Sequence, residues 1–277
     1  MTNAAAADVA FRFLKDIAAD LSAGEITFPT FRDATLRIRH AVDDPSVDTV
    51  TVARAVCAEP MVCAKIVQVA NSAAVSRGGK PVADVRSAIA RVGFVTVRTV
   101  AAAVAVQQLR SSNELAKYSH RAELAWYHSV EVAAHAYFIA NRMTRLNADE
   151  ALFVGLVHDI GYFYLLSKAG RYPELEASPE ALDAGLADWH APIGQSVLHT
   201  FGLSDAALTA IAEHEDGRAH TPPRTLLDVI TLANQFCAPT NPVRLSKTAV
   251  TPPDPQLVAA LAEAQPEIRG LVHALRA

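Results

Sequence analysis

Apolar residues recur every three or four positions along most of this chain, and that spacing predicts α-helices. The clearest example spans residues 4–21, where apolar side chains stand four residues apart from Val9 to Leu21. Gly24 follows this pattern and is a typical C-terminal stop. Because residues four apart lie on one face of a helix, this segment is expected to bury a single stripe.

Turn residues and caps divide the rest of the chain into further helices. Pro29 opens one pattern and the Asp43–Pro45 segment ends it, while Asp48 is suited to cap the next helix. After Gly93, the segment 96–109 is rich in Val, so its spacing alone would also allow a strand, but its length and its alanines favour a helix. The predicted helices cover residues 4–21, 29–42, 48–59, 61–71, 84–92, 96–109, 115–143, 148–159, 182–201, 205–215, 225–237 and 256–275.

The composition agrees with an all-α fold. The 277 residues include 53 alanines, the best helix former, against 12 glycines, and 51% of the residues are apolar. With no convincing strand in the pattern, we expect two packed helical subdomains that meet near Ser111. The expected units are an N-terminal helix (1–24), a helical subdomain (25–111), a second helical subdomain (112–238) and a proline-rich linker with a C-terminal helix (239–277).

The net charge of −4, from 25 basic and 29 acidic residues, gives no general attraction to nucleic acid or to an anionic membrane. One basic segment offers an alternative, because its five cations are accompanied by a single acidic residue, Asp84. These cations could bind nucleic acid or a phosphorylated ligand, although a solvated helix face explains them better. They are Arg77, Lys80, Arg86, Arg91 and Arg98.

The three cysteines and the N-terminus point to the cytoplasm. Cys57, Cys63 and Cys237 form no CxxC pair, which suits small side chains in a reducing compartment. The first ten residues lack the basic and apolar regions of a secretory signal. The longest apolar stretch, residues 100–106, is far shorter than the roughly 20 residues that span a bilayer. We therefore expect a cytoplasmic protein without membrane insertion.

Ten histidines are present, and His158 stands next to Asp159 where an apolar helix is predicted to end. Because the backbone turns at a helix end, both side chains can point to one metal ion. His128, His190 and His214 are spaced about one helix apart, so each can face the same interhelical space. Ordinary packed or exposed side chains are expected at His40, His120, His199, His220 and His273. His135 shares a helix face with His128, so it either supports that residue or is simply packed.

The segment His158–Gly161 resembles the HDIG core of the HD phosphohydrolase superfamily. The order of the segments around it resembles the bacterial HDOD family, signalling relatives of the HD and HD-GYP enzymes, over about residues 25–237. This resemblance implies an N-terminal helical bundle packed on a degenerate HD-type helical subdomain. The other matching motifs are Phe28–Phe31, Asp43–Pro45, Glu59–Ser72, Lys80–Val82, Ala88–Gly93, Trp126–Ser129 and His190–Gly194.

The resemblance also implies a set of metal ligands. The superfamily's last ligand is an aspartate, but Asn234 takes its place here, so one negative charge is missing. On charge alone, Asn234→Asp is expected to raise the affinity for a metal. Two-metal relatives have two consecutive histidines at the position of His214. This chain has only one there, with a carboxylate on each side. The implied ligands of a divalent Fe, Mn, Ni or Zn ion are His128, His158, Asp159, His190, His214 and Asn234.

Two departures from the superfamily pattern bear on catalysis. Active phosphodiesterases follow HDIG with lysine, a cation suited to phosphate, whereas Tyr162 stands here, and no GYP element follows His214. Hydrolysis is disfavoured, because phosphoryl chemistry depends on positive groups that stabilise charge. We expect a non-catalytic signalling module with protein partners. A metal-dependent phosphohydrolase of nucleotides or cyclic dinucleotides is the alternative, and the oligomeric state stays open.

Overall fold

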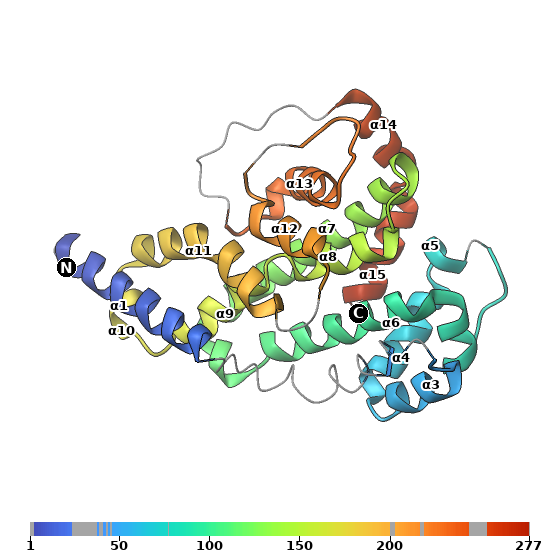
Figure 1. The fold of residues 1–277 in the computed structure, drawn as a ribbon, viewed down its shortest axis with the longest axis horizontal. Helices are drawn as coiled ribbons and strands as arrows, with labels where there is room; N and C mark the ends of the chain where they lie inside the picture. Colours follow the sequence, from blue (N-terminus) through green and yellow to red (C-terminus); the bar gives the residue numbers. More distant parts are fainter. Residues whose placement is uncertain are drawn as a thin grey trace.

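The computed structural model of the chain describes residues 3–23, 38, 41–42, 44, 46–76, 78–199, 203–216, 219–243 and 254–276. Over these residues the regular secondary structure is helical, and no strand occurs among them (Figure 1). The fold is all-α, as the sequence predicts. The helix predicted at residues 29–42 lies almost wholly outside the described residues.

The helices are labelled in chain order in Figure 1. Short 3₁₀ helices also occur at Asn113–Tyr118 and Ala238–Thr240. The α-helices are α1 (Asn3–Ser22), α3 (Thr49–Cys57), α4 (Pro60–Asn71), α5 (Ala73–Ser76), α6 (Val85–Arg110), α7 (Ser119–Met143), α8 (Ala148–Val157), α9 (Ile160–Ala169), α10 (Pro173–Glu176), α11 (Pro179–His199), α12 (Asp205–Glu213), α13 (Leu226–Phe236), α14 (Pro255–Glu263) and α15 (Gln265–Arg276).

Local chemistry explains where several helices begin, bend and end. The Asp48 side chain accepts a hydrogen bond of 2.7 Å from the Thr51 amide, so it caps α3 as predicted. The Val-rich segment is helical, and α6 bends at Gly93, whose φ of 77° lies in the left-handed region. The single helix predicted at residues 256–275 is wrong: it is two helices, α14 and α15, because Pro266 lacks the amide proton that would continue α14.

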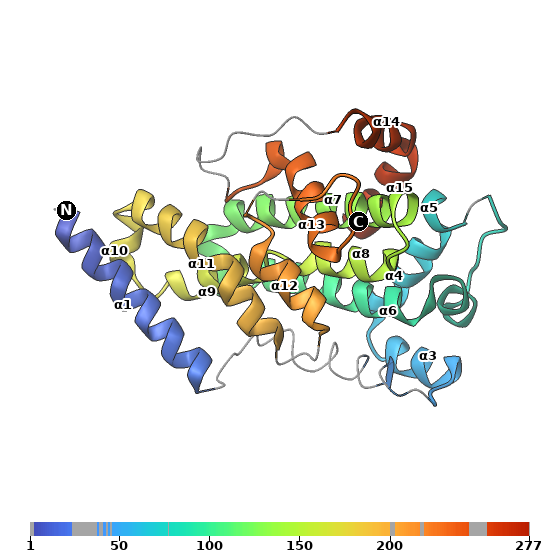
Figure 2. The same cartoon turned by 45° about the horizontal axis from the view of Figure 1, so that its top comes forward.

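Two groups of helices share α6 (Figures 1 and 2). Helices α3, α4 and α5 pack against α6, which also contacts α7, α8 and α9 of the second group. In that second group, α7 packs on α8 and α13, and α11 packs on α9 and α12. Helix α15 contacts α7 as well as α4 and α5, so the C-terminal segment also joins both groups.

Helix α1 lies at the opposite end of the molecule from α3 and packs on α10 and α11 (Figure 2). Its stripe of Val9, Phe13 and Ile17 is buried, as the four-residue spacing predicts. The Phe13 ring meets the Tyr172 ring edge-on at 5.2 Å between centroids. The first helix of the chain therefore stabilises the second group of helices and not the group of α3, α4 and α5 that follows it in the sequence.

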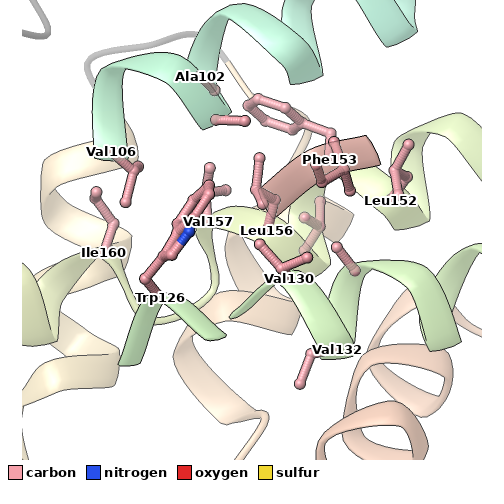
Figure 3. Close-up of a cluster of buried hydrophobic side chains, with 14 of the residues drawn as sticks. Ala102, Val106, Trp126, Val130, Val132, Leu152, Phe153, Leu156, Val157 and Ile160 are labelled. Atoms are coloured by element: carbon pink, nitrogen blue, oxygen red, sulfur yellow. The ribbon is translucent and has the colours of Figure 1, made fainter. Parts of the chain in front are cut away.

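A cluster of buried apolar side chains lies between α6, α7 and α8 (Figure 3). Trp126 of α7 is 1% exposed and lies beside Val106 of α6 and Val157 of α8. By length and composition helix α6 could span a membrane, but most of its apolar stretch is buried inside the protein. This burial is typical of the core helix of a soluble protein.

A buried carboxylate, that of Asp228, organises the loop before α13. It accepts hydrogen bonds of 2.8–2.9 Å from the backbone amides of His220, Arg224 and Thr225. The Thr225 hydroxyl accepts one of 3.1 Å from the Asp228 amide, which completes a capping box. Burial alone would raise the pKa of Asp228, but the surrounding donors outweigh it and the pKa is lowered.

We expect Asp228→Asn to lower the free energy of unfolding by about 2 kcal/mol, because the amide cannot satisfy all of these donors. Since the pKa is lowered in the folded state, the stabilisation is present above the unfolded-state value of about 3.9 and is lost as the pH falls toward the folded-state pKa. Urea titrations of both proteins at neutral and at acidic pH measure this. A stability difference that is unchanged in acid would contradict the assignment.

Candidate metal centre

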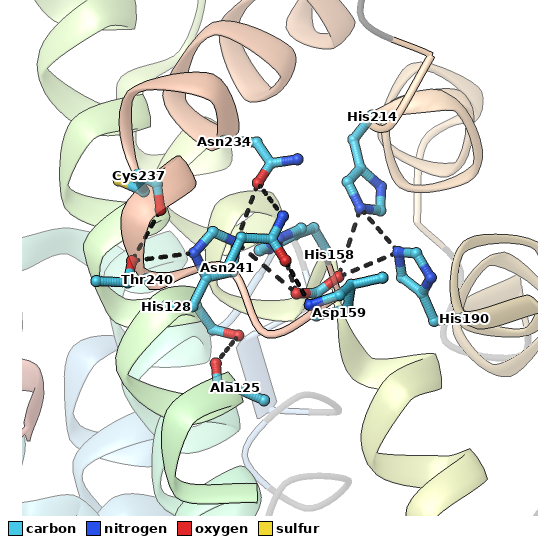
Figure 4. A network of polar contacts seen from close by, with 12 residues as sticks. Ala125, His128, His158, Asp159, His190, His214, Asn234, Cys237, Thr240 and Asn241 are labelled. Carbon is cyan, nitrogen blue, oxygen red and sulfur yellow. Dashed lines mark hydrogen bonds and ion pairs between the residues drawn. The ribbon is translucent and has the colours of Figure 1, made fainter. Parts of the chain in front are cut away.

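Four histidines and one aspartate meet between α7, α9, α11 and α12 (Figure 4). His128 lies on α7 and His190 on α11, while His158 and His214 directly follow the last residues of α8 and α12. Asp159 directly precedes α9. All five side chains are at most 1% exposed. The structure thus brings together the histidines and the aspartate that the sequence singles out.

The two oxygens of the Asp159 carboxylate face different pairs of histidines. Oδ2 lies 3.3 Å from Nε2 of His158 and 3.9 Å from Nε2 of His128. Oδ1 lies 3.5 Å from Nε2 of His190 and 3.4 Å from Nε2 of His214. Two groups of three residues that could hold a metal ion therefore share this one carboxylate.

Backbone carbonyls determine which ring nitrogen faces the centre. In three of the histidines, Nδ1 is in hydrogen-bond contact with a carbonyl oxygen one helical turn earlier in the chain. A carbonyl oxygen only accepts, so each Nδ1 carries the proton and, in the neutral ring, Nε2 turns its lone pair toward Asp159. The pairs are His158 with Gly155 at 2.7 Å, His190 with Leu186 at 2.9 Å, and His214 with Ile211 at 2.8 Å.

This centre holds acceptors that face one another. Nε2 of His158 and both oxygens of Asp159 are buried without a hydrogen-bond partner among the described residues. Burying a carboxylate in this way is unfavourable unless a cation is paired with it. Imidazole nitrogens and a carboxylate suit a divalent transition metal, which accepts electron pairs from both. The residues present fit such an ion, and the four histidines and Asp159 would hold it.

Protonation follows the same arrangement. Burial lowers the pKa of His128 to about 4 and lowers that of His190, so both rings are neutral at pH 7. Burial also opposes protonation of His214, but the adjacent Asp159 carboxylate reverses the effect and its pKa is raised. Burial works against ionisation of Asp159, yet the imidazoles around it, His158 first, hold its pKa well below the usual range. The carboxylate is therefore ionised.

Two residues at the rim, Asn234 and Glu215, complete the centre. Asn234 lies on α13, and its Oδ1 is 3.0 Å from Nε2 of His128. Glu215 directly follows His214, and its Oε1 is 3.6 Å from Nε2 of that histidine. The sequence showed a carboxylate beside His214, but adjacency could not tell whether it reaches the centre. The chain turns after α12, and this turn brings Glu215 to it.

The position after the HDIG segment carries no charge. Tyr162 is 1% exposed, and burial raises its pKa to about 12, although the Arg121 guanidinium lowers it. The phenol therefore stays neutral at physiological pH. Arg121 is itself paired with Asp183. Where the resemblance places a lysine in active relatives, this chain has an uncharged aromatic side chain.

The basic segment does not gather into one face. Arg91 donates hydrogen bonds of 2.7 and 3.3 Å to backbone carbonyls of the turn before α6 and of α4. The Arg98 guanidinium lies 4.8 Å from the centre of an aromatic ring of α8. Lys80 and Arg86 are exposed, and Arg77 lies outside the described residues. Arg91 and Arg98 are thus engaged within the protein.

The remaining described histidines stay outside the centre. His120, His199 and His273 are exposed. His220 pairs with a carboxylate of α13, its Nδ1 lying 2.9 Å from Oδ1. Nδ1 of His135 contacts a backbone carbonyl oxygen of its own helix at 2.8 Å. The packed or exposed role predicted for these side chains agrees with their positions, and His40 lies outside the described residues.

An all-α fold with a buried histidine–aspartate centre at a helix junction defines an HD-type helical protein. The chain belongs to the HDOD family: the HDOD domain matches residues 28–217, more than half of its length. A comparison with curated proteins gave no match.

Several solved structures share this fold. A candidate metal-dependent phosphohydrolase from Shewanella amazonensis SB2B has a TM-score of 0.74 and 22% identity, covering 97% of this chain and 100% of its own. An HDOD domain protein with unknown function from Geobacter sulfurreducens has a TM-score of 0.65 and 20% identity, covering 94% and 97%. A candidate signal transduction protein from Marinobacter aquaeolei VT8 has a TM-score of 0.58 and 18% identity, covering 88% and 59%. Identities at this level show the fold alone.

Gly161 lets α9 and α11 approach closely enough to bring His190 to Asp159. A Cβ atom at Gly161 would lie 2.0 Å from the backbone oxygen of His190 and 2.5 Å from the backbone nitrogen of Gly194. Both are backbone atoms, so no change of rotamer could relieve the clash. The glycine of the HDIG segment is therefore required for packing.

We expect Gly161→Ala to lower the free energy of unfolding by about 3 kcal/mol and to weaken metal binding, because α11 must move away from α9. Gly185→Ala, on α11, is the matched control: nothing lies within 4 Å of its added Cβ. The control should be neutral or stabilising by up to about 1 kcal/mol. Denaturant titration and metal titration of both variants check this, and equal behaviour would contradict the packing argument.

His158→Ala removes the ring that adjoins Asp159 and the α8–α9 junction. We expect the purified wild-type protein to carry stoichiometric transition metal and the variant to lose it, because a metal site depends on its full set of ligands. His120→Ala, at an exposed position on the same helix as His128, should retain the metal. Elemental analysis by mass spectrometry measures the content, and metal retained by the His158 variant would place the site elsewhere.

Proposed function

We propose that this chain is a signalling module that keeps an HD-type metal centre, does not hydrolyse phosphate esters and acts by binding proteins. One observation carries the proposal: a cluster of buried metal donors stands beside an uncharged position where active relatives have a cation for phosphate. The donors are the four buried histidines and Asp159, and the uncharged position is Tyr162. A transition metal of the Fe, Mn, Ni or Zn type suits these ligands.

The charge around the centre supports this proposal. Phosphoryl transfer needs positive groups on the oxygens that gain charge in the transition state. A cation close to Tyr162, the Arg121 guanidinium, is already paired with Asp183. Since no free cation stands beside Tyr162 among the described residues, a metal centre here serves binding or structure better than turnover.

Surface composition favours protein partners over nucleic acid. Phe11 and Trp189 are 68% and 45% exposed and border an apolar groove of about 330 Å³ between α1 and α11. Large exposed apolar side chains of this kind are typical of protein contact surfaces. The cations Arg91 and Arg98, in contrast, are engaged within the protein. The cytoplasmic location stays a prediction.

A metal-dependent phosphohydrolase is the second candidate function. It is favoured by the two groups of three donors that share Asp159. Its substrate would be a nucleotide or a cyclic dinucleotide, with Asn234 tolerated at the rim of the centre.

Turnover separates the two candidates. We expect protein loaded in turn with Fe²⁺, Mn²⁺, Ni²⁺ and Zn²⁺ to release no product from cyclic dinucleotides, nucleotides or a chromogenic phosphodiester above the level of His158→Ala. Chromatography of the reaction mixtures measures this, with the His120→Ala protein as a control for handling. Metal-dependent turnover that disappears in the His158 variant would instead establish the phosphohydrolase.

A further inference from the structure

Glu215 contacts both sides of the metal centre through one oxygen atom. Its Oε1 accepts hydrogen bonds of 3.0 Å from the side-chain amide of Asn234 and 3.1 Å from that of Asn241. The same atom lies 3.6 Å from Nε2 of His214. The carboxylate therefore lies next to the end of α12 and is linked to α13 by its hydrogen bond with the Asn234 side chain.

These hydrogen bonds determine which way the Asn234 amide points. Because Nδ2 of Asn234 donates to Glu215, its Oδ1 turns toward the centre and lies 3.0 Å from Nε2 of His128 (Figure 4). The Asn241 amide also donates to this Oδ1, at 3.2 Å. Reversing the Asn234 amide would set its oxygen against the Glu215 carboxylate, which is unfavourable because both atoms only accept.

We propose that Glu215 is the second anionic group of the metal centre and compensates for the carboxylate missing at position 234. This inference rests on the metal-binding part of the proposed function. Glu215 supplies a negative charge beside His214, and its carboxylate polarises the Asn234 amide so that Oδ1 becomes a stronger electron-pair donor to a metal ion. Asn234 and Asn241 are positioning residues for this charge.

Glu215 restores the negative charge that is missing because Asn234 stands in place of an aspartate. With Asp159, Glu215 brings the negative charge of the centre to −2, the value that balances one divalent cation. Compared with the superfamily pattern, the second negative charge lies on the residue that follows His214 and not on α13. The amide of Asn234 is hydrogen-bonded to this carboxylate and so connects the two positions. A centre of this composition binds a cation more strongly than Asn234 alone would suggest.

The same contacts change the expected effect of Asn234→Asp. On charge alone this substitution should raise metal affinity. Here the new carboxylate would replace an amide that donates a hydrogen bond of 3.0 Å to Glu215. Two carboxylates at such a short distance repel each other. The single variant should therefore gain no affinity. Combining it with Glu215→Gln keeps the total charge and reverses the hydrogen bond, so the double variant should bind well.

Metal affinity tests the proposal without any need for turnover. Dissociation constants for Zn²⁺ and Mn²⁺ are measured for the full chain by competition with a chromophoric chelator. We expect Glu215→Gln to weaken binding about 10- to 100-fold, the usual effect of losing a supporting carboxylate. Asn234→Asp should bind no better than wild type, and the double variant should recover to within about threefold of it. Glu213→Gln, the same change at an exposed position, should have no effect.

The outcomes distinguish this inference from the proposed function. Wild-type affinity in Glu215→Gln, or a double variant that binds no better than Glu215→Gln, overturns the role of Glu215. Thermal unfolding of each apo variant shows that it is folded, and the glutamine keeps an acceptor for both asparagine amides. A wild-type chain that binds neither metal overturns both proposals. Hydrolysis by the wild-type chain refutes only the non-catalytic proposal and leaves the affinity result standing.

Discussion

A carboxylate buried among four imidazoles is the constraint around which the second group of helices is arranged. Asp159 has no hydrogen-bond donor among the described residues, and its two oxygens face two pairs of histidines. Bringing these rings to one point requires α9 and α11 to touch through their backbones, which they do at Gly161 and Gly194. The polar centre and the packing of the helices therefore depend on each other.

The rest of the chain holds this arrangement in place from outside. Helix α6 packs on both groups of helices, α15 joins them a second time, and α1 covers α10 and α11 at the far end. These contacts bury apolar side chains and also include ion pairs, such as that of Arg142 with Glu267 between α7 and α15. The two groups are therefore linked by packing and not by the connecting loop alone. A metal centre whose interatomic distances must be held to within about half an ångström benefits from this support.

The charges around the centre differ between the inward-facing side chains and the positions next to them. The acceptors point inward and are held by backbone carbonyls, while the neighbouring positions carry a neutral phenol at Tyr162 and a paired guanidinium at Arg121. The amide of Asn234 faces His128 on one side and a carboxylate on the other. The inward-facing Nε2 of His158 and both oxygens of Asp159 lack a hydrogen-bond partner among the described residues, which supports the proposed metal centre.

Helix positions and caps followed from the sequence, because periodicity and capping chemistry are local properties. The convergence of the histidines on Asp159 was expected from the family resemblance, since spacing alone does not bring distant segments together. The division of the last helix and the separate helix α9 were missed. A single proline can either begin a helix or interrupt one, and a continuous apolar run does not show where one helix ends and the next begins. Tertiary structure alone decided three things: where α1 packs, which cations are engaged, and that Glu215 reaches Asn234 from 19 residues away in the chain. Each depends on contacts between distant segments, for which neighbouring residues carry no signal.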